Sequence, residues 1–335
     1  MSKYLEIQGL KVVYTSDEET VYAVNGVDLS LERGQTLGLV GETGAGKTTI
    51  AKSILRILPE RQSKITAGEI RIEGENLLEK PERDMLPIRG NKVAMIFQDP
   101  MTALNPTMTV GEQISEVIAL HGKGTRQEVE NRTIEMLEMV GIPAERYLEY
   151  PHQFSGGMKQ RVVIAKALAC NPELLLADEP TTALDVTIQA QVLALMSDLQ
   201  KKFQTAMLLI THDLGVVAEV CDKVSIMYAG QIVESGPIEK IYEETAHPYT
   251  KGLFGSLPSI SSKVKRLSPI NGLMPDPSNL PKGCPFHPRC PRATKACESR
   301  EPVRTEISPG HIVRCLLYEQ GGEPETAENA GATAE

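Results

Sequence analysis

The residues best suited to chemistry lie in a glycine-rich stretch that follows a short apolar run. Three glycines precede Lys47 and hydroxyl residues follow it, with the spacing G-x-x-x-x-G-K-T. Glycine lets the backbone adopt a positive φ and approach a ligand closely, and consecutive N–H groups at a helix start attract an anion. The stretch therefore predicts a loop that binds the phosphates of a nucleoside triphosphate. Its members are Gly41, Glu42, Thr43, Gly44, Ala45, Gly46, Lys47, Thr48 and Thr49.

The flanking sequence supplies the structural context that this motif requires. Residues 37–40 are apolar apart from one glycine, and a helical pattern runs from Lys47 to Leu58, where Pro59 stops it. A buried strand, a tight turn and a helix are expected in that order. Lys47 can then reach the β- and γ-phosphates, and the Thr48 hydroxyl can bind Mg²⁺. The alternative is a glycine-rich turn that matches the motif by chance.

Two later strands deliver polar side chains to the same edge of the predicted sheet. Asp178 and Glu179 follow the apolar run 174–177, and His212 follows the run 207–211. Beside a phosphate site, Asp178 is suited to hold Mg²⁺ through water and Glu179 to polarise the attacking water. We expect His212 to face the γ-phosphate. The alternatives are a solvated strand end for the carboxylates and a hydrogen-bonded core residue for the histidine.

A second glycine-containing helix start and two tyrosines are further candidates. Ser155, Gly156 and Gly157 open an apolar helix that runs to residue 170, so their N–H groups could bind a second anion or simply form an ordinary capped start. Tyr14 ends the first predicted strand and could stack on an adenine ring. Tyr22 is its rival, and packing within a strand is the alternative for Tyr14.

The spacing of apolar residues predicts an α/β fold. Residues 4–34 alternate as antiparallel strands, and residues 109–170 show helical spacing with an N-cap at Thr109. Further strands are expected at 68–72 and 92–97, a helix from 185 to 200, and a hairpin across 224–234. These elements surround the phosphate loop as a mainly parallel sheet with helices.

Composition excludes several classes of protein. The chain has 35 basic and 44 acidic residues, a net charge of −9, and no basic stripe that could neutralise a nucleic-acid backbone. No apolar run approaches the roughly 20 residues that span a bilayer. The first residues lack the pattern of a secretion signal. We therefore expect a cytoplasmic chain with no nucleic-acid partner.

The region after residue 240 differs in composition. Nine of the 22 prolines lie between Pro269 and Pro309, which predicts that this part forms no regular helical or sheet layer. Residues 319–335 contain five glutamates and no lysine or arginine, and we expect a disordered acidic tail. Two cysteines, Cys170 and Cys221, lie among apolar residues and are expected to be small buried side chains.

Four cysteines gather in the proline-rich part, with the spacing C-x5-C-x6-C-x17-C. Four thiolates suit either Zn²⁺ or an iron–sulfur cluster. Structural zinc sites favour closer cysteine pairs, so the wider spacing favours a [4Fe–4S] cluster. His287 and His311 are spare donors that keep zinc open, and four unrelated thiols are the third possibility. The predicted cluster ligands are Cys284, Cys290, Cys297 and Cys315.

The motifs in their order resemble the ATP-binding subunit of an ABC transporter, over roughly residues 3–240. The phosphate loop is followed by Gln98, the 155–157 helix start, Asp178-Glu179, Asp185 and His212. The resemblance implies a P-loop NTPase of ABC type with a mixed core sheet, an antiparallel β subdomain and a helical subdomain at about 100–170.

The same resemblance implies roles for individual residues. Such subunits pair head to tail, so that the turn 155–157 of one subunit caps the γ-phosphate bound by the other. Tyr14 then stacks on adenine, and Thr48, Gln98 and Asp178 hold Mg²⁺ directly or through water. Glu179 and His212 become the catalytic residues. Asp185 joins the residues around the nucleotide.

Three stretches, 98–106, 150–158 and 247–250, resemble the oligopeptide/dipeptide importer branch, and the cysteine-bearing part resembles its D-type subunit. This implies an ATP-binding domain at 1–240, an extension at 241–318 and a tail at 319–335. The expected partners are a second homologous ATPase, two membrane-spanning permeases and an extracytoplasmic solute-binding protein. The chain would lie peripherally on the cytoplasmic membrane face.

Three alternatives to peptide import remain at this point. The cargo could be a nickel chelate or another solute of the same branch. The chain could be a soluble ABC ATPase that acts on nucleic acid or ribosomes, although such proteins usually contain two cassettes or a coiled-coil insert. The cysteine region could instead be a redox or metal sensor.

Overall fold

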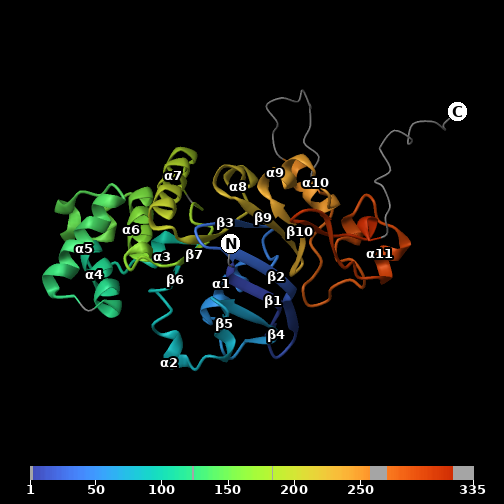
Figure 1. The fold of residues 1–335 in the computed structure, drawn as a ribbon, viewed down its shortest axis with the longest axis horizontal. Helices are drawn as coiled ribbons and strands as arrows, with labels where there is room; N and C mark the ends of the chain where they lie inside the picture. Colours follow the sequence, from blue (N-terminus) through green and yellow to red (C-terminus); the bar gives the residue numbers. More distant parts are fainter. Residues whose placement is uncertain (1–2, 123, 183, 257–269, 320–335) are drawn as a thin grey trace.

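The architecture consists of two β-sheets with helices around them, and a C-terminal part attached to one end (Figure 1). The C-terminal part denotes the described residues after 240. The computed structural model describes residues 3–122, 124–182, 184–256 and 270–319. Of the predicted acidic tail only Glu319 lies within this range, where its carboxylate pairs with Arg300; residues 320–335 lie outside the described residues.

The main sheet is mixed, as predicted for this fold. Five adjacent strands, from β9 to β6 at one edge, run parallel, and three strands continue the sheet beyond β9 in antiparallel order. The hairpin expected across 224–234 is confirmed. In spatial order the strands are β11 (Arg304–Ser308), β12 (His311–Arg314), β10 (Gln231–Pro237), β9 (Lys223–Tyr228), β3 (Thr36–Val40), β8 (Ala206–Thr211), β7 (Leu174–Asp178) and β6 (Val93–Ile96).

A second, antiparallel sheet forms from the N-terminal strands. The expected antiparallel pairing of residues 4–34 is confirmed, and the strand predicted at 68–72 begins earlier. Apolar residues of this sheet pack against α1 and the adjacent face of the main sheet in one core. In spatial order the strands are β2 (Thr20–Glu32), β1 (Lys3–Thr15), β4 (Ser63–Ile72) and β5 (Glu75–Asn76).

The helical region predicted at 100–170 lies at the end of the molecule opposite the C-terminal part (Figure 1). Two of its helices begin with a capping box, in which Thr109 or Thr125 exchanges hydrogen bonds with the glutamate three residues later. The region comprises α3 (Pro100–Ala103), α4 (Val110–His121), α5 (Arg126–Met139), the 3₁₀ turns Ala144–Leu148 and Pro151–Gln153, and α6 (Gly156–Leu168).

Helix α1 (Lys47–Leu55) is shorter than predicted. Arg56 adopts φ 52°, a left-handed conformation, and its N–H bonds to the carbonyl of Ser53, which ends the helix before Pro59. The helix predicted from 185 to 200 is confirmed and slightly longer. The remaining elements before residue 240 are α2 (Glu82–Met85), the 3₁₀ turn Leu77–Glu79, α7 (Val186–Phe203), α8 (Leu214–Val220) and α9 (Ile238–Glu243), which extends past it.

The prediction that the proline-rich part forms no regular layer is wrong for its last residues. Strands β11 and β12 pair with each other, and β12 joins β10, so residues 304–314 extend the main sheet. Within the described residues, the prolines of this part precede these strands or lie in the turn between them, at Pro309. The other elements of this part are α10 (Pro248–Gly255), the 3₁₀ turns His287–Arg289 and Leu316–Tyr318, and α11 (Lys295–Ser299).

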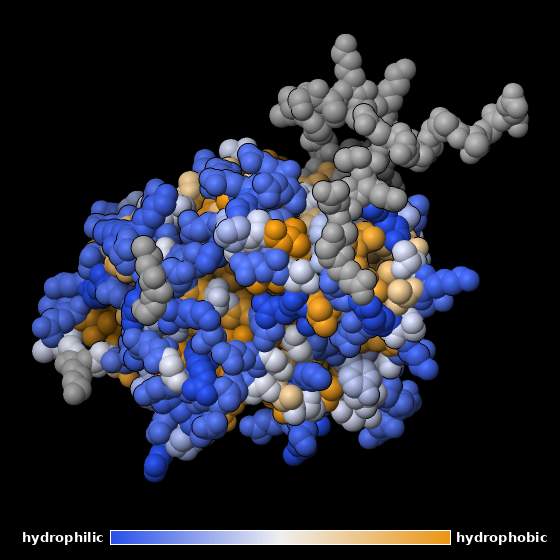
Figure 2. Space-filling view, turned by 45° about the vertical axis from the view of Figure 1, so that its right-hand side comes forward, coloured by the Kyte–Doolittle hydropathy of each residue, from blue (hydrophilic) through white to orange (hydrophobic). Residues whose placement is uncertain are grey.

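The C-terminal part shares its core with the main sheet. Phe286 is 2% exposed and belongs to the same apolar cluster as the strands of the main sheet. The surface seen in Figure 2 is largely hydrophilic, with apolar side chains in small groups. Across the described residues, no helix combines the length and apolar character needed to cross a membrane.

Candidate functional site

The phosphate-loop stretch lies between β3 and α1, as the sequence predicts. Gly46 has φ 103° and a Cβ there would meet the Ala23 carbonyl oxygen at 2.2 Å. A Cβ on Gly41 would meet the Met227 carbonyl oxygen at 2.2 Å. Both contacts are to backbone, so neither position accepts a side chain without rearrangement. The loop therefore packs tightly between β2 and β9.

Lys47 lies inside this loop. Its Nζ donates to the carbonyl oxygens of Gly41 at 2.7 Å and Glu42 at 3.0 Å. The residue is 6% exposed, and this burial lowers the pKa of the ammonium, although Glu179 and Asp178 raise it. An anion that reaches the loop would meet a positive charge held close to its backbone N–H groups.

Thr48 and Asp178 meet where α1 approaches the end of β7. The Thr48 hydroxyl donates to Asp178 Oδ1 at 3.0 Å. Burial raises the pKa of Asp178, and the Thr48 hydrogen bond works against that shift. Two oxygen donors at the mouth of a phosphate loop are the chemistry that Mg²⁺ prefers.

Glu179 lies at the centre of a polar group formed by three strand ends. Its carboxylate accepts hydrogen bonds from Gln98 Nε2 and Thr182 Oγ1, both at 3.0 Å, and lies 3.4 Å from His212 Nδ1. Burial raises the pKa of this carboxyl, but the bonds from Thr182 and His212 outweigh burial and lower the pKa overall. The group is therefore an ionised carboxylate, as a general base requires.

The backbone at Glu179 is unusual. Its φ is 46°, a left-handed conformation that non-glycine residues seldom adopt, and its N–H donates to the Ile210 carbonyl at 2.9 Å. This bond to β8 turns the carboxylate away from the path of β7 and towards Gln98 and His212. The structure thus brings Gln98, Glu179 and His212 together, as the sequence predicts.

Tyr14 lies beside the start of α1. Its hydroxyl is 3.3 Å from Thr49 Oγ1, so its ring is close to the phosphate loop. Tyr22 lies on the neighbouring strand β2, paired with Val13, is 46% exposed, and its N–H donates to the Pro277 carbonyl in the C-terminal part. Of the two tyrosines predicted for adenine, Tyr14 therefore has the contact with the loop.

The second glycine-containing helix start packs against α7. Ser155 caps α6 by accepting from the Met158 N–H at 3.4 Å. A Cβ on Gly157 would meet Ile188 Cγ2 at 2.4 Å, whereas one on Gly156 would have Leu184 at 3.7 Å. Gly157 is therefore required for packing within the subunit. Asp185 caps α7 by accepting from the Ile188 N–H at 3.0 Å, a structural contact that the sequence analysis did not foresee.

The six cysteines are all free thiols, and the two outside the cluster are buried or half-buried as expected. In the C-terminal part, burial raises the pKa of Cys284, Cys290 and Cys315, and neighbouring thiols of the set raise each further. Nevertheless, the part of the chain that the structure describes contains no group of three or more His, Cys, Asp or Glu side chains arranged to hold a metal ion. The predicted cluster thus gains no support from the structure.

The two histidines considered as spare metal donors have other partners. His311 is fully buried, and its Nε2 lies 2.8 Å from Glu234 Oε1, whereas its buried Nδ1 has no hydrogen-bond partner among the described residues, so its role as a spare metal donor stays a prediction. Glu234 also accepts from the N–H groups of Ala246 and His247 at 2.7 and 3.0 Å. His287 Nδ1 lies 2.9 Å from the Cys284 carbonyl oxygen. Both histidines therefore stabilise the fold of the C-terminal part.

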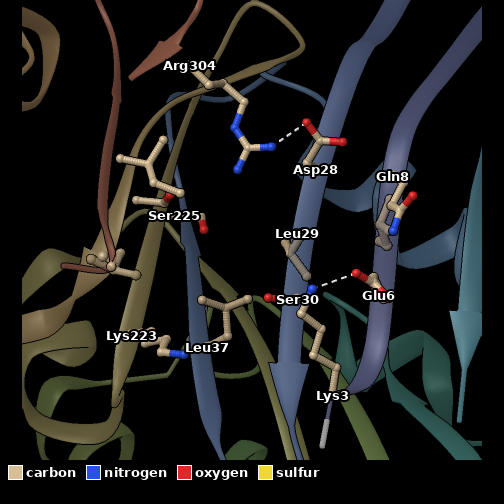
Figure 3. Close-up of a pocket in the computed structure, with 16 residues that line it drawn as sticks. Lys3, Glu6, Gln8, Asp28, Leu29, Ser30, Leu37, Lys223, Ser225 and Arg304 are labelled. Carbon is tan, nitrogen blue, oxygen red and sulfur yellow. Dashed lines mark hydrogen bonds and ion pairs between the residues drawn. The ribbon is translucent and has the colours of Figure 1, made fainter. Parts of the chain in front are cut away.

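A polar groove with a volume of about 440 Å³ lies away from these residues, between the antiparallel sheet and β9 (Figure 3). Its charged side chains are paired, Lys3 with Glu6 and Arg304 with Asp28. None of the predicted site residues lines it. The chemistry therefore belongs to the strand ends beside α1.

Sequence reasoning missed three residues at this site. Thr182 bonds Glu179 from three positions along the chain, a spacing that could have suggested the contact. Tyr249 and Arg289 both bond to Glu42 of the phosphate loop, from 207 and 247 residues away. No local sequence pattern predicts contacts between residues so far apart in the chain.

Comparison with known proteins agrees with this geometry. Two family models match, described as ABC transporter over residues 24–182 and as oligopeptide/dipeptide transporter, C-terminal region, over residues 233–297. The dimeric structure of the bacterial ABC transporter cassette MJ0796 superposes with a TM-score of 0.63 at 28% identity, covering 70% of this chain and 98% of that one.

Full-length relatives extend the similarity to the C-terminal part. The chain is 50% identical to the oligopeptide transport ATP-binding protein AppD of Bacillus subtilis (strain 168), over 96% of this chain and 99% of that protein. It is 48% identical to the dipeptide transport ATP-binding protein DppD of the same organism, over 96% and 97%. The chain therefore belongs to the ABC transporter ATPases, as an ATP-binding subunit of the oligopeptide/dipeptide type.

Proposed function

We propose that this chain hydrolyses ATP at the strand ends beside α1 to energise the import of di- or oligopeptides. The observation that carries the proposal is the ionised Glu179 carboxylate held between Gln98 and His212, one residue after an Asp178 bonded to Thr48. The names of the full-length relatives support the peptide cargo. A nickel chelate or another solute of the same branch is the alternative cargo.

Each residue has a role in this proposal. The loop 41–49 with Lys47 binds the phosphates, and Tyr14 stacks on the adenine. Glu179 accepts a proton from the attacking water, and His212 contacts the γ-phosphate. Thr48, Asp178 and Gln98 are the oxygen donors that would hold Mg²⁺, whose chemistry is to neutralise phosphate charge. Gln98 bonds Glu179 in the structure, so it would exchange that partner on binding.

Substitution of Glu179 tests the assignment. Glu179→Gln keeps the shape of the side chain and its acceptor for Thr182, but it removes the base. Turnover should fall about 100-fold or more, the scale expected for a positioned base, while ATP binding persists. The measurement is phosphate release by the assembled transporter together with ATP affinity. Near-wild-type turnover would show that another group activates water.

We further propose that the turn 155–157 acts across a dimer with a homologous ATPase. The match to a dimeric cassette supports this arrangement. Because Gly157 packs on Ile188 within the subunit, substitutions there would disturb folding as well as the partner site. Gly156 is the better test position, and Gly157→Ala serves as the packing control.

Gly156→Asp should abolish ATP-induced pairing because it adds a negative charge beside the partner's γ-phosphate. ATP affinity of the single subunit should stay nearly unchanged. Sedimentation in the presence of ATP, with a catalytically inactive background such as Glu179→Gln, reports pairing. A collapse of single-subunit affinity would contradict the proposal.

The remaining partners follow the pattern of the family. We propose that the chain lies peripherally on the cytoplasmic membrane face and contacts two permeases, which an extracytoplasmic binding protein supplies. A groove of about 500 Å³ beside Gln98, with Phe97 45% exposed at its rim, fits a cytoplasmic segment of the permease. Co-purification with membrane subunits supports this, whereas ribosomes or DNA would support a non-transport ABC ATPase.

The four cysteines of the C-terminal part are proposed to bind a [4Fe–4S] cluster. The support comes from the sequence, in which four cysteines lie within one proline-rich segment. Anaerobic purification with iron, sulfide and zinc analysis tests this. Stoichiometric zinc without iron or sulfide would overturn the cluster in favour of zinc, and absence of all three would overturn both.

A further inference from the structure

Glu42, the second residue of the phosphate loop, is held by two side chains of the C-terminal part. Its backbone N–H donates to the hydroxyl of Tyr249 at 3.1 Å. Its two carboxylate oxygens lie 3.2 and 3.1 Å from Arg289 Nη1. Tyr249 belongs to α10 and Arg289 to the 3₁₀ turn between Cys284 and Cys290. Both the backbone and the side chain of Glu42 are therefore fixed from outside the ATP-binding domain.

The Arg289 side chain is fixed on several sides. It is only 7% exposed, and its Nε donates to the Asn271 carbonyl at 3.1 Å. Its guanidinium lies over the ring of Tyr228, with the carbon 5.8 Å from the ring centre. A buried guanidinium needs a partner of opposite charge, and Glu42 is that partner. The orientation of Arg289 thus determines where the Glu42 carboxylate can lie.

Tyr249 is fixed by an aromatic cluster. Its ring centre lies 4.6 Å from that of Tyr228 and 5.4 Å from that of Phe286, and the residue is fully buried. Burial raises the pKa of its hydroxyl, so the group stays neutral and can accept the Glu42 N–H. Loss of the hydroxyl would leave that N–H without its partner.

The effect of these contacts reaches the residue that faces the phosphates. The carbonyl oxygen of Glu42 accepts from Lys47 Nζ at 3.0 Å. A shift of the Glu42 peptide therefore changes the position of the Lys47 ammonium. The chain of contacts runs from the C-terminal part, through Arg289 and Tyr249, to Glu42 and then to Lys47.

We propose that Arg289 and Tyr249 are positioning residues for the phosphate loop, so that the C-terminal part completes the ATP site of its own subunit. The proposal rests on the assignment of residues 41–49 as the ATP site. It gives the extension a role in nucleotide binding that is independent of whether its cysteines bind a metal.

The test compares two arginines of the same region in the full-length chain. Arg289→Met removes the charge and keeps the length, and Arg304→Met is the matched control. Arg304 also joins the C-terminal part to the ATP-binding domain, through Asp28, but it does so at the groove shown in Figure 3, which Glu42 does not line. ATP affinity by calorimetry, KM and kcat of ATP hydrolysis, and Tm are measured for each.

Arg289→Met should raise the Kd and KM for ATP about tenfold, the effect of losing one charge-assisted hydrogen bond, with a smaller change in kcat. Arg289→Lys should recover part of the affinity, and Tyr249→Phe should raise Kd several-fold. Arg304→Met should leave Kd within about twofold of wild type, because it loses only a surface ion pair. Combining Arg289→Met with Glu42→Gln should add little to either single change.

Two results would overturn the proposal. One is an Arg289→Met variant with a lower Tm but unchanged Kd and KM, because the arginine would then be a structural tie only. The other is full additivity of Arg289→Met and Glu42→Gln. Lys47→Ala separates this proposal from the ATP-site assignment, since wild-type ATP binding by that variant would instead refute the assignment. If Arg289→Met does not fold, Arg289→Lys and Tyr249→Phe provide the same comparison.

Discussion

The strand ends beside α1 and the C-terminal part secure their polar groups in different ways. At the strand ends, functional side chains bond to one another: Thr48 to Asp178, and Gln98 and His212 to Glu179. Where the C-terminal part meets β10, the buried Glu234 carboxylate also bonds to the backbone, because it accepts from the N–H groups of Ala246 and His247 as well as lying 2.8 Å from His311 Nε2. Contacts of the first kind can be exchanged for a ligand, whereas contacts of the second kind must persist for the fold to hold.

This difference predicts that substitutions at the two regions separate function from stability. At the strand ends, the buried charges lower the free energy of unfolding, and their role is to bind a ligand. In the C-terminal part, the buried network contributes to folding directly. The three predictions below test that separation, from the largest effect to the smallest.

Lys47→Ala should have the largest effect, and on binding alone. ATP affinity should fall about 100-fold or more, because the ammonium is the charge closest to the phosphates. The free energy of unfolding should change by less than about 1 kcal/mol, since removing a buried charge also removes its desolvation cost. Calorimetry and urea unfolding measure the two quantities. Lys92→Ala, at an exposed lysine, is the control. A large loss of stability would contradict the separation.

His247 should make the stability of the C-terminal part depend on pH. It is buried at the start of α10 and accepts the Tyr249 N–H at 3.0 Å. Burial lowers its pKa to about 4, although Glu234 raises it. As pH falls from about 6.5 towards 4, the unfolded chain binds a proton that the folded chain does not, so the free energy of unfolding should fall, by up to about 3 kcal/mol.

His247→Asn isolates this effect, because asparagine keeps a capping acceptor but does not titrate. Burial raises the pKa of Glu234, but its hydrogen bonds, including those with His311 and the Ala246 and His247 N–H groups, lower it overall. The stability from this group is therefore lost as pH falls through the usual carboxylate pKa, which lies below the pH 5–6.5 interval used for the histidine. Urea unfolding at several pH values in this interval should show a slope for the wild type and a flatter line for the variant. Parallel lines would refute the assignment.

How much the sequence could predict depended on the distance between contacting residues. The strand–loop–helix around Lys47 and the carboxylates after β7 were predictable because a local pattern defines each of them. The strands β11 and β12 were missed because the many prolines of this part argued against any strand, although both strands lie in short stretches that contain no proline. Arg289 and Tyr249 were missed because their contacts with Glu42 cross more than 200 residues. Sequence patterns predict local structure, whereas contacts between residues so far apart in the chain can be identified only in the folded structure.

The glycines show the same limit from another side. Gly41, Gly46 and Gly157 were each predicted to be glycine because of a ligand. The structure adds a packing reason for all three, since a Cβ would meet Met227, Ala23 or Ile188. A motif therefore predicts which residue type a position requires. The packing around that position determines whether a substitution changes ligand binding alone or also disturbs the fold.

The smallest expected changes in stability concern Cys170 and Cys221. These two cysteines can be compared with the cysteines of the C-terminal part, so that the residue type is the same in both regions. Cys221 is 6% exposed between Val217 and the main sheet, and burial together with Asp222 raises the pKa of its thiol to about 12. For Cys315, by contrast, the pKa of about 11 reflects burial and also the three other cysteines of the proposed cluster.

Cys221→Ala should therefore cost about 1 kcal/mol of unfolding free energy, the effect of one small buried group, and leave iron, sulfide and zinc unchanged. Cys170→Ala should cost less, because that thiol is half-buried and makes only a 3.7 Å contact with the Val117 carbonyl. Cys315→Ala is the matched substitution in the C-terminal part and should remove bound metal. Equal metal content in Cys221→Ala and Cys315→Ala would contradict the ligand set, because only Cys315 belongs to the four cysteines of the proposed cluster.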